Sequence, residues 1–414
     1  MKVLIVVESF PRISETFVLN HIKGLLDAKI EVKIFTLNKY VGPAHQLYYD
    51  YDLEKITTVK PRLSPNVLTR YMTGISLFRK CYRVCPKAAL DSINVFKYKW
   101  AALKFIRLYE LSLFATAEKF DVVHCHFGPV GEKVAGYQLK GILPAPLIVS
   151  FHGYDTDSPH IISNPHFYFN LKRRSDLYIV NSGYTLKKII SLGLDEKKAT
   201  IIPAALDVNF FYNPAQSQRN NQSIRLITIG RLIPVKGIEF ALRAFHRLKE
   251  KNGLNKNIEY VIIGEGPEEP VLRRLCEELS LSENVKFLGG RTQTEIRDYL
   301  TLSDVFLLTG IKDLNGRQEA QGLVIQEAQA MGLPVIVSDI GGVSEGFVDG
   351  KTGFLVEEKN ISQIADCLLK LVSDGYLRAE MGLQGRKFVE NKYSIEVTTE
   401  KIVNEYKLLL AVQP

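Results

Sequence analysis

Short apolar runs rich in β-branched residues alternate with longer helical patterns along nearly all of the 414 residues. This alternation is typical of parallel β-sheets covered by helices. The runs form two sets, residues 4–7, 122–127, 147–152 and 177–181 in the first half and residues 225–230, 260–264, 285–289, 305–309 and 334–338 in the second. We therefore predict an α/β fold with two doubly wound parallel sheets.

The two sets of runs also predict the domain organisation. Residues 213–223, NPAQSQRNNQS, have almost no apolar side chain and are the best candidate for a linker. Each half begins with a strand, a sharp turn and a helix, so we expect two Rossmann-like domains facing each other across a cleft, with ligands at the carboxyl ends of the strands. Residues 395–412 have a helical period and no following strand, so they are free to pack on another domain.

Composition excludes several classes of protein. No apolar run reaches the roughly 18 residues that a transmembrane helix needs. The first residues lack the apolar segment of a signal peptide. The five cysteines are scattered and odd in number, which favours reduced thiols in the cytoplasm over a disulfide framework.

The positive charge is concentrated in one segment. The chain carries a formal net charge of +8, whereas residues 60–108 alone carry +10, with Asp91 as their single acid. Aromatic residues are interspersed with the basic ones, and we expect a helix between residues 92 and 108. The pattern resembles an interfacial element that binds an anionic membrane. The alternative is a helix that buries its aromatic side chains in its own domain and exposes its lysines to water.

Other ligand classes find little support. The basic segment has no RNP, zinc-finger, helix-turn-helix or KH signature, so we predict no nucleic-acid partner. There is no Walker loop, and residues 264–269, GEGPEE, lack the third glycine of a dinucleotide fingerprint. His124 and His126 share one face of a predicted strand, but no third ligand lies nearby in the sequence. We therefore predict no metal site, and a packing role for His124.

Two cations stand close to the first strand of the second half. Arg231 and Lys236 lie five residues apart, around the turn at the carboxyl end of that strand. Two cations so placed can clamp a diphosphate.

A second anion site is predicted farther along the chain. Gly322 stands at the start of a predicted helix, where the free backbone N–H groups of Gln321, Gly322 and Leu323 can bind a phosphate with the help of the helix dipole. Glu319 precedes the helix and can accept hydrogen bonds from sugar hydroxyls, and Glu327 lies within it and can bind a ribose diol. Each glutamate taken alone is also compatible with a solvated or capping carboxylate.

Taken in order, these motifs resemble the donor half of the retaining GT-B glycosyltransferases of family 4. They are GRLIPVKG (230–237), IIGEGPEEPVLR (262–273), NVKFLGG (284–290), the pair Glu319 and Glu327, and GLPVIVSDIGGVSEGFVDGKTGFLV (332–356). In the first half, ESFPRISETF (8–17), HCHFG (124–128) and SFHGYD (150–155) resemble the bacterial branch that builds colanic-acid-type exopolysaccharides. The resemblance covers essentially the whole chain.

The resemblance implies a hexosyltransferase that moves a sugar from a nucleotide-diphosphate donor to an acceptor hydroxyl with retention, without a cofactor or metal ion. Carried over to this sequence, Arg231 and Lys236 hold the diphosphate and Glu327 holds the ribose. Glu319, with the amides that follow it, positions the donor sugar and phosphate, and His152 lies beside that sugar. Donors aimed at the departing diphosphate each contribute several kcal/mol in a closed cleft.

The sequence departs from the family in the turn after its first strand. Many members have a Gly-Gly loop there, whereas this chain has SFPRIS, so Arg12, Ser14 and Glu15 are candidates for contact with donor or acceptor. Ser14 can also cap the first helix, with Glu15 in its first turn. The nucleotide base is expected to meet the backbone around Gly289 and Gly290, with UDP favoured and GDP possible.

The complete prediction is a cytoplasmic enzyme, peripheral at the inner face of the membrane. An acceptor-binding domain spans residues 1–205, a nucleotide-sugar (donor) domain spans 206–394, and a helix at 395–414 packs back on the first domain. The expected partners are the nucleotide-sugar, a glycan or lipid-linked acceptor in cell-surface polysaccharide synthesis, and an anionic membrane surface contacted through residues 60–108. The alternatives are an inverting transferase, a nucleotide-sugar epimerase, or a catalytically silent scaffold that binds membrane or glycan.

Overall fold

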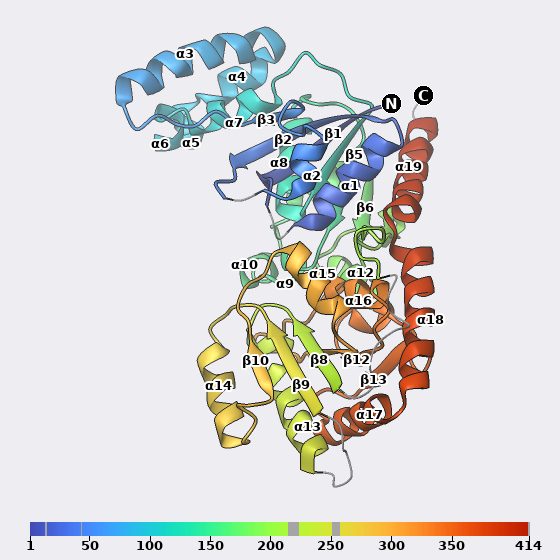
Figure 1. Cartoon of the computed structure of the whole chain (residues 1–414). Coiled ribbons are helices and arrows are strands. Elements are labelled where there is room, and N and C mark those ends of the chain that lie inside the picture. Colours follow the sequence, from blue (N-terminus) through green and yellow to red (C-terminus); the bar gives the residue numbers. More distant parts are fainter. Residues whose placement is uncertain (13–14, 43, 214–222, 251–256, 413–414) are drawn as a thin grey trace. The chain divides into compact units, whose positions relative to one another are not determined.

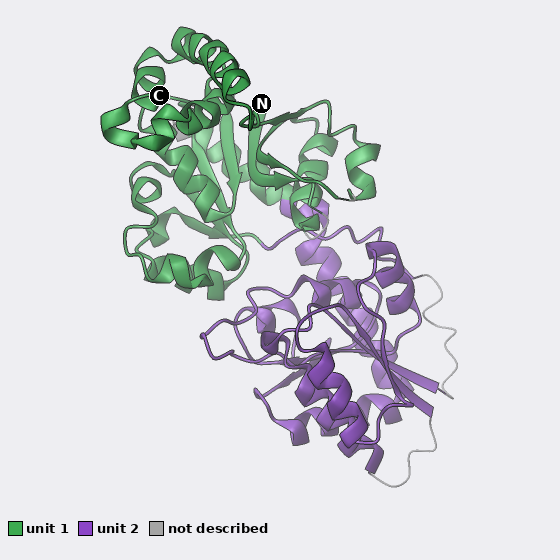
Figure 2. Ribbon diagram, turned by 90° about the vertical axis from the view of Figure 1, so that its left-hand side faces the viewer, with its two compact units in different colours: residues 1–202, 399–414 green, residues 203–398 purple. Residues whose placement is uncertain are grey.

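A computed structural model describes residues 1–12, 15–42, 44–213, 223–250 and 257–412. These residues form two compact units (Figure 2). The first unit contains Met1–Ile202 and Thr399–Pro414, and the second contains Pro203–Thr398. The predicted linker, residues 213–223, lies outside the described residues except at its two ends.

The first unit contains a parallel seven-stranded sheet in the order β3-β2-β1-β4-β5-β6-β7 (Figure 1). The strands are β1 (Lys2–Phe10), β2 (Glu31–Lys39), β3 (Thr57–Val59), β4 (Val122–His126), β5 (Leu147–Phe151), β6 (Leu177–Val180) and β7 (Ala199–Ile201). The order reverses between β1 and β4, and such a switch point is where doubly wound sheets bind ligands.

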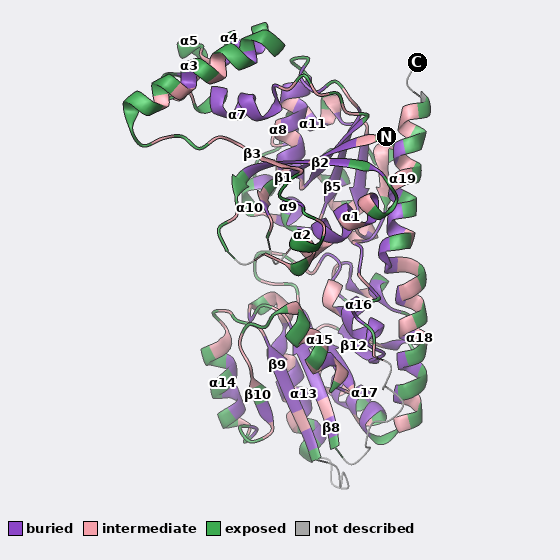
Figure 3. Cartoon of the chain, turned by 45° about the horizontal axis from the view of Figure 1, so that its top comes forward, coloured by how far each residue is buried: buried purple, intermediate pink, exposed green. Residues whose placement is uncertain are grey.

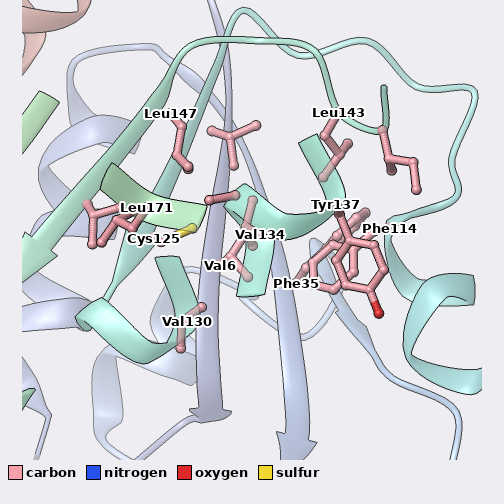
Figure 4. Close-up of a cluster of buried hydrophobic side chains, with 14 of the residues drawn as sticks. Val6, Phe35, Phe114, Cys125, Val130, Val134, Tyr137, Leu143, Leu147 and Leu171 are labelled. Carbon is pink, nitrogen blue, oxygen red and sulfur yellow. The ribbon is translucent and has the colours of Figure 1, made fainter. Parts of the chain in front are cut away.

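Helices cover both faces of this sheet, and alternate side chains of its strands are buried on opposite faces. Leu4 and Val6 of β1 belong to one core cluster, and Val3, Ile5 and Val7 belong to the other. Figure 4 shows the first cluster, where Val6 and Cys125 meet side chains of α8 such as Val134. The helices are α1 (Thr16–Asp27), α2 (Gln46–Asp50), α3 (Val67–Val84), α4 (Pro86–Ser92), α5 (Val95–Tyr98), α6 (Trp100–Leu103), α7 (Ile106–Phe114), α8 (Gly128–Gln138), α9 (Tyr154–Asp157), α10 (Pro159–Ile162), α11 (Phe169–Arg174), α12 (Gly183–Ser191) and α19 (Ile395–Val412).

The basic segment differs from the single helix predicted between residues 92 and 108. Helices α5, α6 and α7 divide it, because Lys99 and Phe105 have positive φ angles of 48° and 58° that no continuous helix accommodates. Its aromatic residues also differ in how far they are buried. Phe105 packs against the core, whereas Phe96 is fully exposed and Trp100 is 74% exposed. In Figure 3 much of α3 to α5 is exposed, while the central strands are buried.

The start of α1 also differs from the prediction. Glu15 occupies the N-cap position rather than the first turn, and its side chain makes no capping hydrogen bond. Ser14 lies outside the described residues.

The final helix, α19, contributes to the core of the first unit. Ile402 and Tyr406 are buried in the same cluster as residues of β1 and α1. The chain thus returns to its first unit after completing the second.

The second unit contains a six-stranded parallel sheet in the order β10-β9-β8-β11-β12-β13. The strands are β8 (Ser223–Ile229), β9 (Asn257–Ile263), β10 (Val285–Phe287), β11 (Val305–Leu308), β12 (Val335–Ser338) and β13 (Gly353–Val356). The helices are α13 (Ile238–Glu250), α14 (Glu269–Glu278), α15 (Gln293–Thr301), α16 (Leu323–Ala330), α17 (Ile361–Ser373) and α18 (Gly375–Tyr393). The switch point lies between β8 and β11, and two core clusters again occupy the two faces.

Candidate functional site

The loop that follows β8 is held against the end of β11 by a close backbone contact. Gly237 has a φ of +58°, and a Cβ at this position would lie 2.0 Å from the carbonyl oxygen of Thr309. The hydroxyl of Thr309 in turn donates to the carbonyl oxygen of Gly237 at 2.9 Å. Only glycine permits this approach, which fixes the one-turn 3₁₀ helix Pro234–Lys236 at the switch point of the second sheet.

Lys236 and Glu319, two residues predicted to bind the donor, form an ion pair in this loop region. The distance from Nζ of Lys236 to Oε2 of Glu319 is 2.5 Å, and the two side chains are 12% and 22% exposed. Arg231 is exposed, and within the described ranges its guanidinium forms no ion pair. The structure therefore presents Arg231 as a free cation and Lys236 as a neutralised one.

The segment that carries Glu319 is fixed by the loop after β12. The backbone N–H of Gly341 donates to Oε1 of Gln318 at 2.8 Å, and that of Gly342 donates to the carbonyl oxygen of Glu319 at 2.9 Å. Gly341 has a φ of +55°, and a Cβ there would lie 2.0 Å from the same carbonyl oxygen.

Helix α16 begins where the sequence predicts it. Gly322 is its N-cap with a φ of +69°, and the helix runs from Leu323. Among the described residues, no hydrogen bond occupies the backbone N–H groups of Gln321, Gly322 and Leu323. The side-chain carbonyl of Gln321 accepts from the N–H of Ala204 at 3.0 Å, while its Nε2 is buried without a partner in the described chain. N–H groups in this position, at the positive end of α16, are able to bind an anion.

Glu327 is a buried carboxyl group on α16. Its residue is 7% exposed, and within the described chain its side chain has no hydrogen-bond or ion-pair partner. Burial raises the pKa of Glu327 to about 7. A buried carboxylate without a donor is costly, so this group favours a ligand that supplies hydroxyls, as a ribose does.

The two glycines predicted near the base are already engaged. The carbonyl oxygen of Gly289 accepts from the N–H of Gly264 at 2.9 Å, and the N–H of Gly290 donates to Oε1 of Glu265 at 3.1 Å. Sequence reasoning missed Glu265, although it lies in the GEGPEE motif.

His152 in the first unit follows β5, and a buried carboxylate holds its loop. Oδ1 of Asp155 accepts from the N–H groups of His152 and Gly153, and Oδ2 accepts from that of Gly128, each at 2.9 Å. Burial raises the pKa of Asp155 to about 6, although these hydrogen bonds oppose the shift. Sequence reasoning missed Asp155, whose signal was its place at the end of SFHGYD.

Arg12 and Glu15, the other candidates in the first unit, contact each other. Nη1 of Arg12 lies 3.0 Å from Oε1 of Glu15. Burial raises the pKa of Glu15, and the hydrogen bond from Arg12 partly opposes that shift. The structure thus gives these two side chains a mutual ion pair beside the end of β1.

A third histidine joins the pair on β4. His21 of α1 lies beside His124 and His126, and one ligand atom from each falls within 4.8 Å of the others. No local pattern indicates this neighbour, because His21 lies more than one hundred residues before His124 and belongs to a helix.

Two family profiles match consecutive parts of the chain. The profile described as "Glycosyltransferase Family 4" matches residues 14–210, and the profile described as "Glycosyl transferases group 1" matches residues 210–388. Together the two profiles span residues 14–388, and the protein is a glycosyltransferase.

Two relatives match this transferase over nearly its whole length. It is 27% identical to WcaL of Escherichia coli K12, provisionally named as a colanic acid biosynthesis glycosyltransferase, over 98% of this chain and 99% of the relative. It is 26% identical to the amylovoran biosynthesis glycosyltransferase AmsK of Erwinia amylovora, over 97% of this chain and 98% of the relative.

The solved structure of HepE from Anabaena, in complex with UDP, shares the fold of the transferase. The TM-score is 0.71 at 16% identity, over 99% of this chain and all of HepE. The predicted GT-B class, with two doubly wound units, is confirmed.

Among the described residues, no helix has the length and apolarity to cross a bilayer.

Proposed function

We propose that the protein transfers a sugar from a nucleoside-diphosphate donor to a hydroxyl of a glycan or lipid-linked acceptor during synthesis of a cell-surface polysaccharide. The names of WcaL and AmsK support the polysaccharide setting. The observation that carries the proposal is a combination in the second unit: α16 has a helix N-terminus and a buried carboxyl group, and neither has a partner among the described residues.

In this proposal each feature of the second unit binds one part of the donor. The amides at Gln321 to Leu323 and the side chains of Arg231 and Lys236 bind the diphosphate, whose charge grows as the glycosidic bond breaks. The carboxylate of Glu327 accepts hydrogen bonds from the ribose hydroxyls. Glu319 releases Lys236 to the phosphate and turns to the donor sugar.

The proposed donor is a UDP-sugar, with a GDP-sugar as the alternative. The backbone at Gly289 and Gly290 is the proposed contact for the base, and Glu265 sets its geometry by accepting from the N–H of Gly290. HepE was solved with UDP. A direct comparison of nucleotides decides between the two donors.

We further propose that the reaction retains the anomeric configuration. In front-face transfer the departing phosphate helps to deprotonate the acceptor, so the enzyme needs no carboxylate pair at glycosidase spacing. In this proposal Glu319 contacts the donor sugar, and Glu327 is buried and contacts the ribose, so neither is assigned as a base. NMR of the product tests the configuration, and transfer that persists in EDTA tests the expectation that no metal is required.

A thermal-shift screen tests the donor site. UDP, GDP, ADP, CMP and dTDP are added to the purified protein and to its Lys236→Ala and Glu327→Ala variants. A ligand at one hundred times its dissociation constant adds about 2.7 kcal/mol to the stability of the fold. Stabilisation by one diphosphate, weakened in both variants, supports the proposal. Binding without transfer would favour the silent scaffold, and no response to any nucleotide would contradict the proposed donor site.

We propose that the enzyme works at the inner face of the membrane, docked through α3 to α6 on anionic lipid. Most basic residues of segment 60–108 are exposed. On α3, Leu68, Met72 and Ile75 form an exposed apolar stripe, while the opposite face packs inward through Gly74 and Cys81. Apolar and basic side chains together match an anionic bilayer surface, where each cation contributes roughly 1 kcal/mol.

Liposome co-sedimentation tests this docking surface. The triple variant Arg79→Ala, Arg83→Ala and Lys104→Ala removes three exposed cations of the segment. We expect weaker binding to vesicles that contain phosphatidylglycerol, with little binding to neutral vesicles in any case. The matched control removes three exposed lysines elsewhere in the first unit, Lys119, Lys187 and Lys197. Equal binding by both triple variants would contradict membrane docking through this segment.

A further inference from the structure

A continuous chain of hydrogen bonds runs through the core of the first unit to His152. Five contacts join six side chains, of which only His152 is predicted to lie beside the donor sugar. The links are Ser150 Oγ to His124 Nε2 at 2.7 Å, His124 Nδ1 to Tyr406 Oη at 2.6 Å, Tyr406 Oη to His21 Nε2 at 3.3 Å, His21 Nδ1 to His126 Nε2 at 2.9 Å, and His126 Nδ1 to His152 Nε2 at 3.0 Å.

Four elements supply the chain. Ser150 and His152 flank the end of β5, His124 and His126 lie on β4, His21 lies on α1 and Tyr406 lies on α19. Ser150, His124, His126, His21 and Tyr406 are buried, and His152 is half-buried at the open end. Stacked rings support the path, with centroids 5.2 Å apart both between His124 and His126 and between His126 and His152.

The imidazoles in this chain are neutral near pH 7. Burial lowers the pKa of His21 to about 4 and that of His152 to about 3, and it lowers those of His124 and His126 as well. A neutral imidazole has one N–H and one lone pair. Each ring that donates at one nitrogen must therefore accept at the other, so every histidine passes the direction on. The hydroxyl of Tyr406 has one hydrogen and two lone pairs, so it either passes the direction on or accepts from both His124 and His21.

Three arrangements of hydrogen atoms are possible, and they differ at the two ends of the chain and at Tyr406. In the first, the hydroxyl of Ser150 donates to His124 and every later link donates toward His152, which is left with its hydrogen on Nδ1. In the second, every link is reversed, and the buried hydroxyl hydrogen of Ser150 has no acceptor among the described residues. In the third, the oxygen of Tyr406 accepts from both His124 and His21, and its own buried hydrogen has no acceptor among the described residues. A buried unpaired donor costs about 1–3 kcal/mol, so the first arrangement, which has none, is favoured.

We propose that Ser150, His124, Tyr406, His21 and His126 are positioning residues that lock His152 in the tautomer with hydrogen on Nδ1. His152 then acts as a hydrogen-bond donor to a sugar oxygen and has no lone pair to accept a proton from the acceptor. The role toward the sugar rests on the proposed function, whereas the lock itself does not. Through Tyr406, the end of the chain that returns from the second unit helps to set the chemistry at His152.

Nitrogen-15 NMR of the histidine side chains tests the lock without any substrate. His152→Asn removes one pair of signals and so assigns His152. We expect those signals to show hydrogen on Nδ1 alone at pH 7. Hydrogen on Nε2, an equal mixture or a charged ring in the unaltered protein would overturn the proposal. So would a zinc ion bound to His21 and His126 in samples prepared without EDTA, because the metal would occupy their lone pairs.

Tyr406→Phe interrupts the chain while keeping the ring that fills the core. We expect His152 to become a mixture of tautomers, and kcat to fall about twofold if the mixture is equal, with the KM of the donor unchanged. Tyr178→Phe is the control, because it removes another buried hydroxyl of the same unit outside the chain. A single unchanged tautomer in Tyr406→Phe would show that the tyrosine does not transmit the lock.

The role of His152 as a donor has its own test. Asparagine can place an N–H close to the position of Nδ1, whereas alanine cannot, and the loss of one positioned donor typically costs about 10²–10³ in kcat. We expect His152→Asn to retain at least about tenfold more kcat than His152→Ala. Equal kcat values for the two variants would contradict donation. Absence of transfer by any form would refute the proposed function and leave the NMR result on the lock intact.

Discussion

Nζ of Lys236 lies 2.5 Å from Oε2 of Glu319, although 83 positions separate the two residues in the sequence. Without a ligand, the lysine that we assign to the diphosphate is therefore neutralised by the carboxylate that we assign to the donor sugar. The pair is only slightly exposed, so solvent screens it weakly. Under the proposed function, donor binding moves the lysine from Glu319 to the phosphate.

The pair predicts opposite effects on binding and on turnover. Glu319→Gln removes the competing negative charge, so we expect a nucleoside diphosphate to bind as tightly as before or up to about tenfold more tightly, a change of up to about 1.4 kcal/mol. Transfer should fall, because the carboxylate is then missing from the sugar. Isothermal titration with the diphosphate and an assay of transfer measure the two effects.

Lys236→Met is the variant matched to Glu319→Gln, because it removes the other partner of the same ion pair. It leaves Glu319 unpaired near the phosphate, so we expect both binding and transfer to weaken. If both substitutions weakened binding of the diphosphate equally, competition between Glu319 and the phosphate would be ruled out.

The buried carboxyl of Glu327 predicts a pH-dependent stability. Burial raises its pKa from the usual 4.5 to about 7, which corresponds to roughly 3 kcal/mol. The folded state binds this proton more tightly than the unfolded state does. The resulting contribution to the stability of the fold is fully present below pH 4.5 and is lost as the pH rises through 7. Glu327→Gln cannot titrate. We therefore compare the free energy of unfolding of the variant with that of the unaltered protein. From pH 4 to pH 8 we expect this difference to shift by about 3 kcal/mol in favour of the variant.

Urea unfolding at the two pH values measures this difference. Other titrating groups, including the buried Asp155, are common to both proteins and cancel in the comparison. A difference that did not change with pH would mean that Glu327 is ionised at its usual pKa in the folded chain, and it would remove the case for a ribose as its missing partner.

The predicted runs in the sequence located the strands that are buried on both faces, because such strands read as continuous apolar segments. β2 was missed because its sequence, EVKIFTLNK, mixes polar residues with apolar ones. β3 and β7 were missed because each has only three residues, none of them buried. The single helix expected after residue 92 was wrong because positive φ angles at Lys99 and Phe105 depend on packing that no local pattern records.

The candidate site was predictable in its residue types but not in its contacts. Lys236, Glu319 and Glu327 were identified from spacing and chemistry. Their pairing was not, because an ion pair across 83 positions depends on how two loops meet. His21 was invisible for the same reason, since it reaches the β4 histidines from a helix. The sequence therefore shows which groups can bind a ligand, and the fold determines which of them are paired with other side chains of the protein.

Asp155→Asn tests how the loop of His152 is held. One of the two carboxylate oxygens becomes an amide that cannot accept, so at least one buried N–H among His152, Gly153 and Gly128 loses its partner. We expect a loss of about 2 kcal/mol in the free energy of unfolding and a fall in transfer. Asp195→Asn is the control, because this exposed residue caps a short helix and asparagine caps equally well. Equal stability of the two variants would show that Asp155 does not support the loop.

Gly341→Ala should damage both the fold and the donor site, whereas Gly350→Ala should damage neither greatly. Both glycines have positive φ angles, +55° and +69°, so alanine costs each about 1–2 kcal/mol of backbone strain. At Gly350 a Cβ meets nothing within 4 Å, whereas at Gly341 it would lie 2.0 Å from the carbonyl oxygen of Glu319. We expect Gly341→Ala to lose about 3 kcal/mol or more in urea unfolding and to bind nucleoside diphosphate more weakly, because Glu319 and its lysine must move. If the two alanine variants lost the same stability and kept the same affinity, the contact between the two loops would have no part in shaping the site.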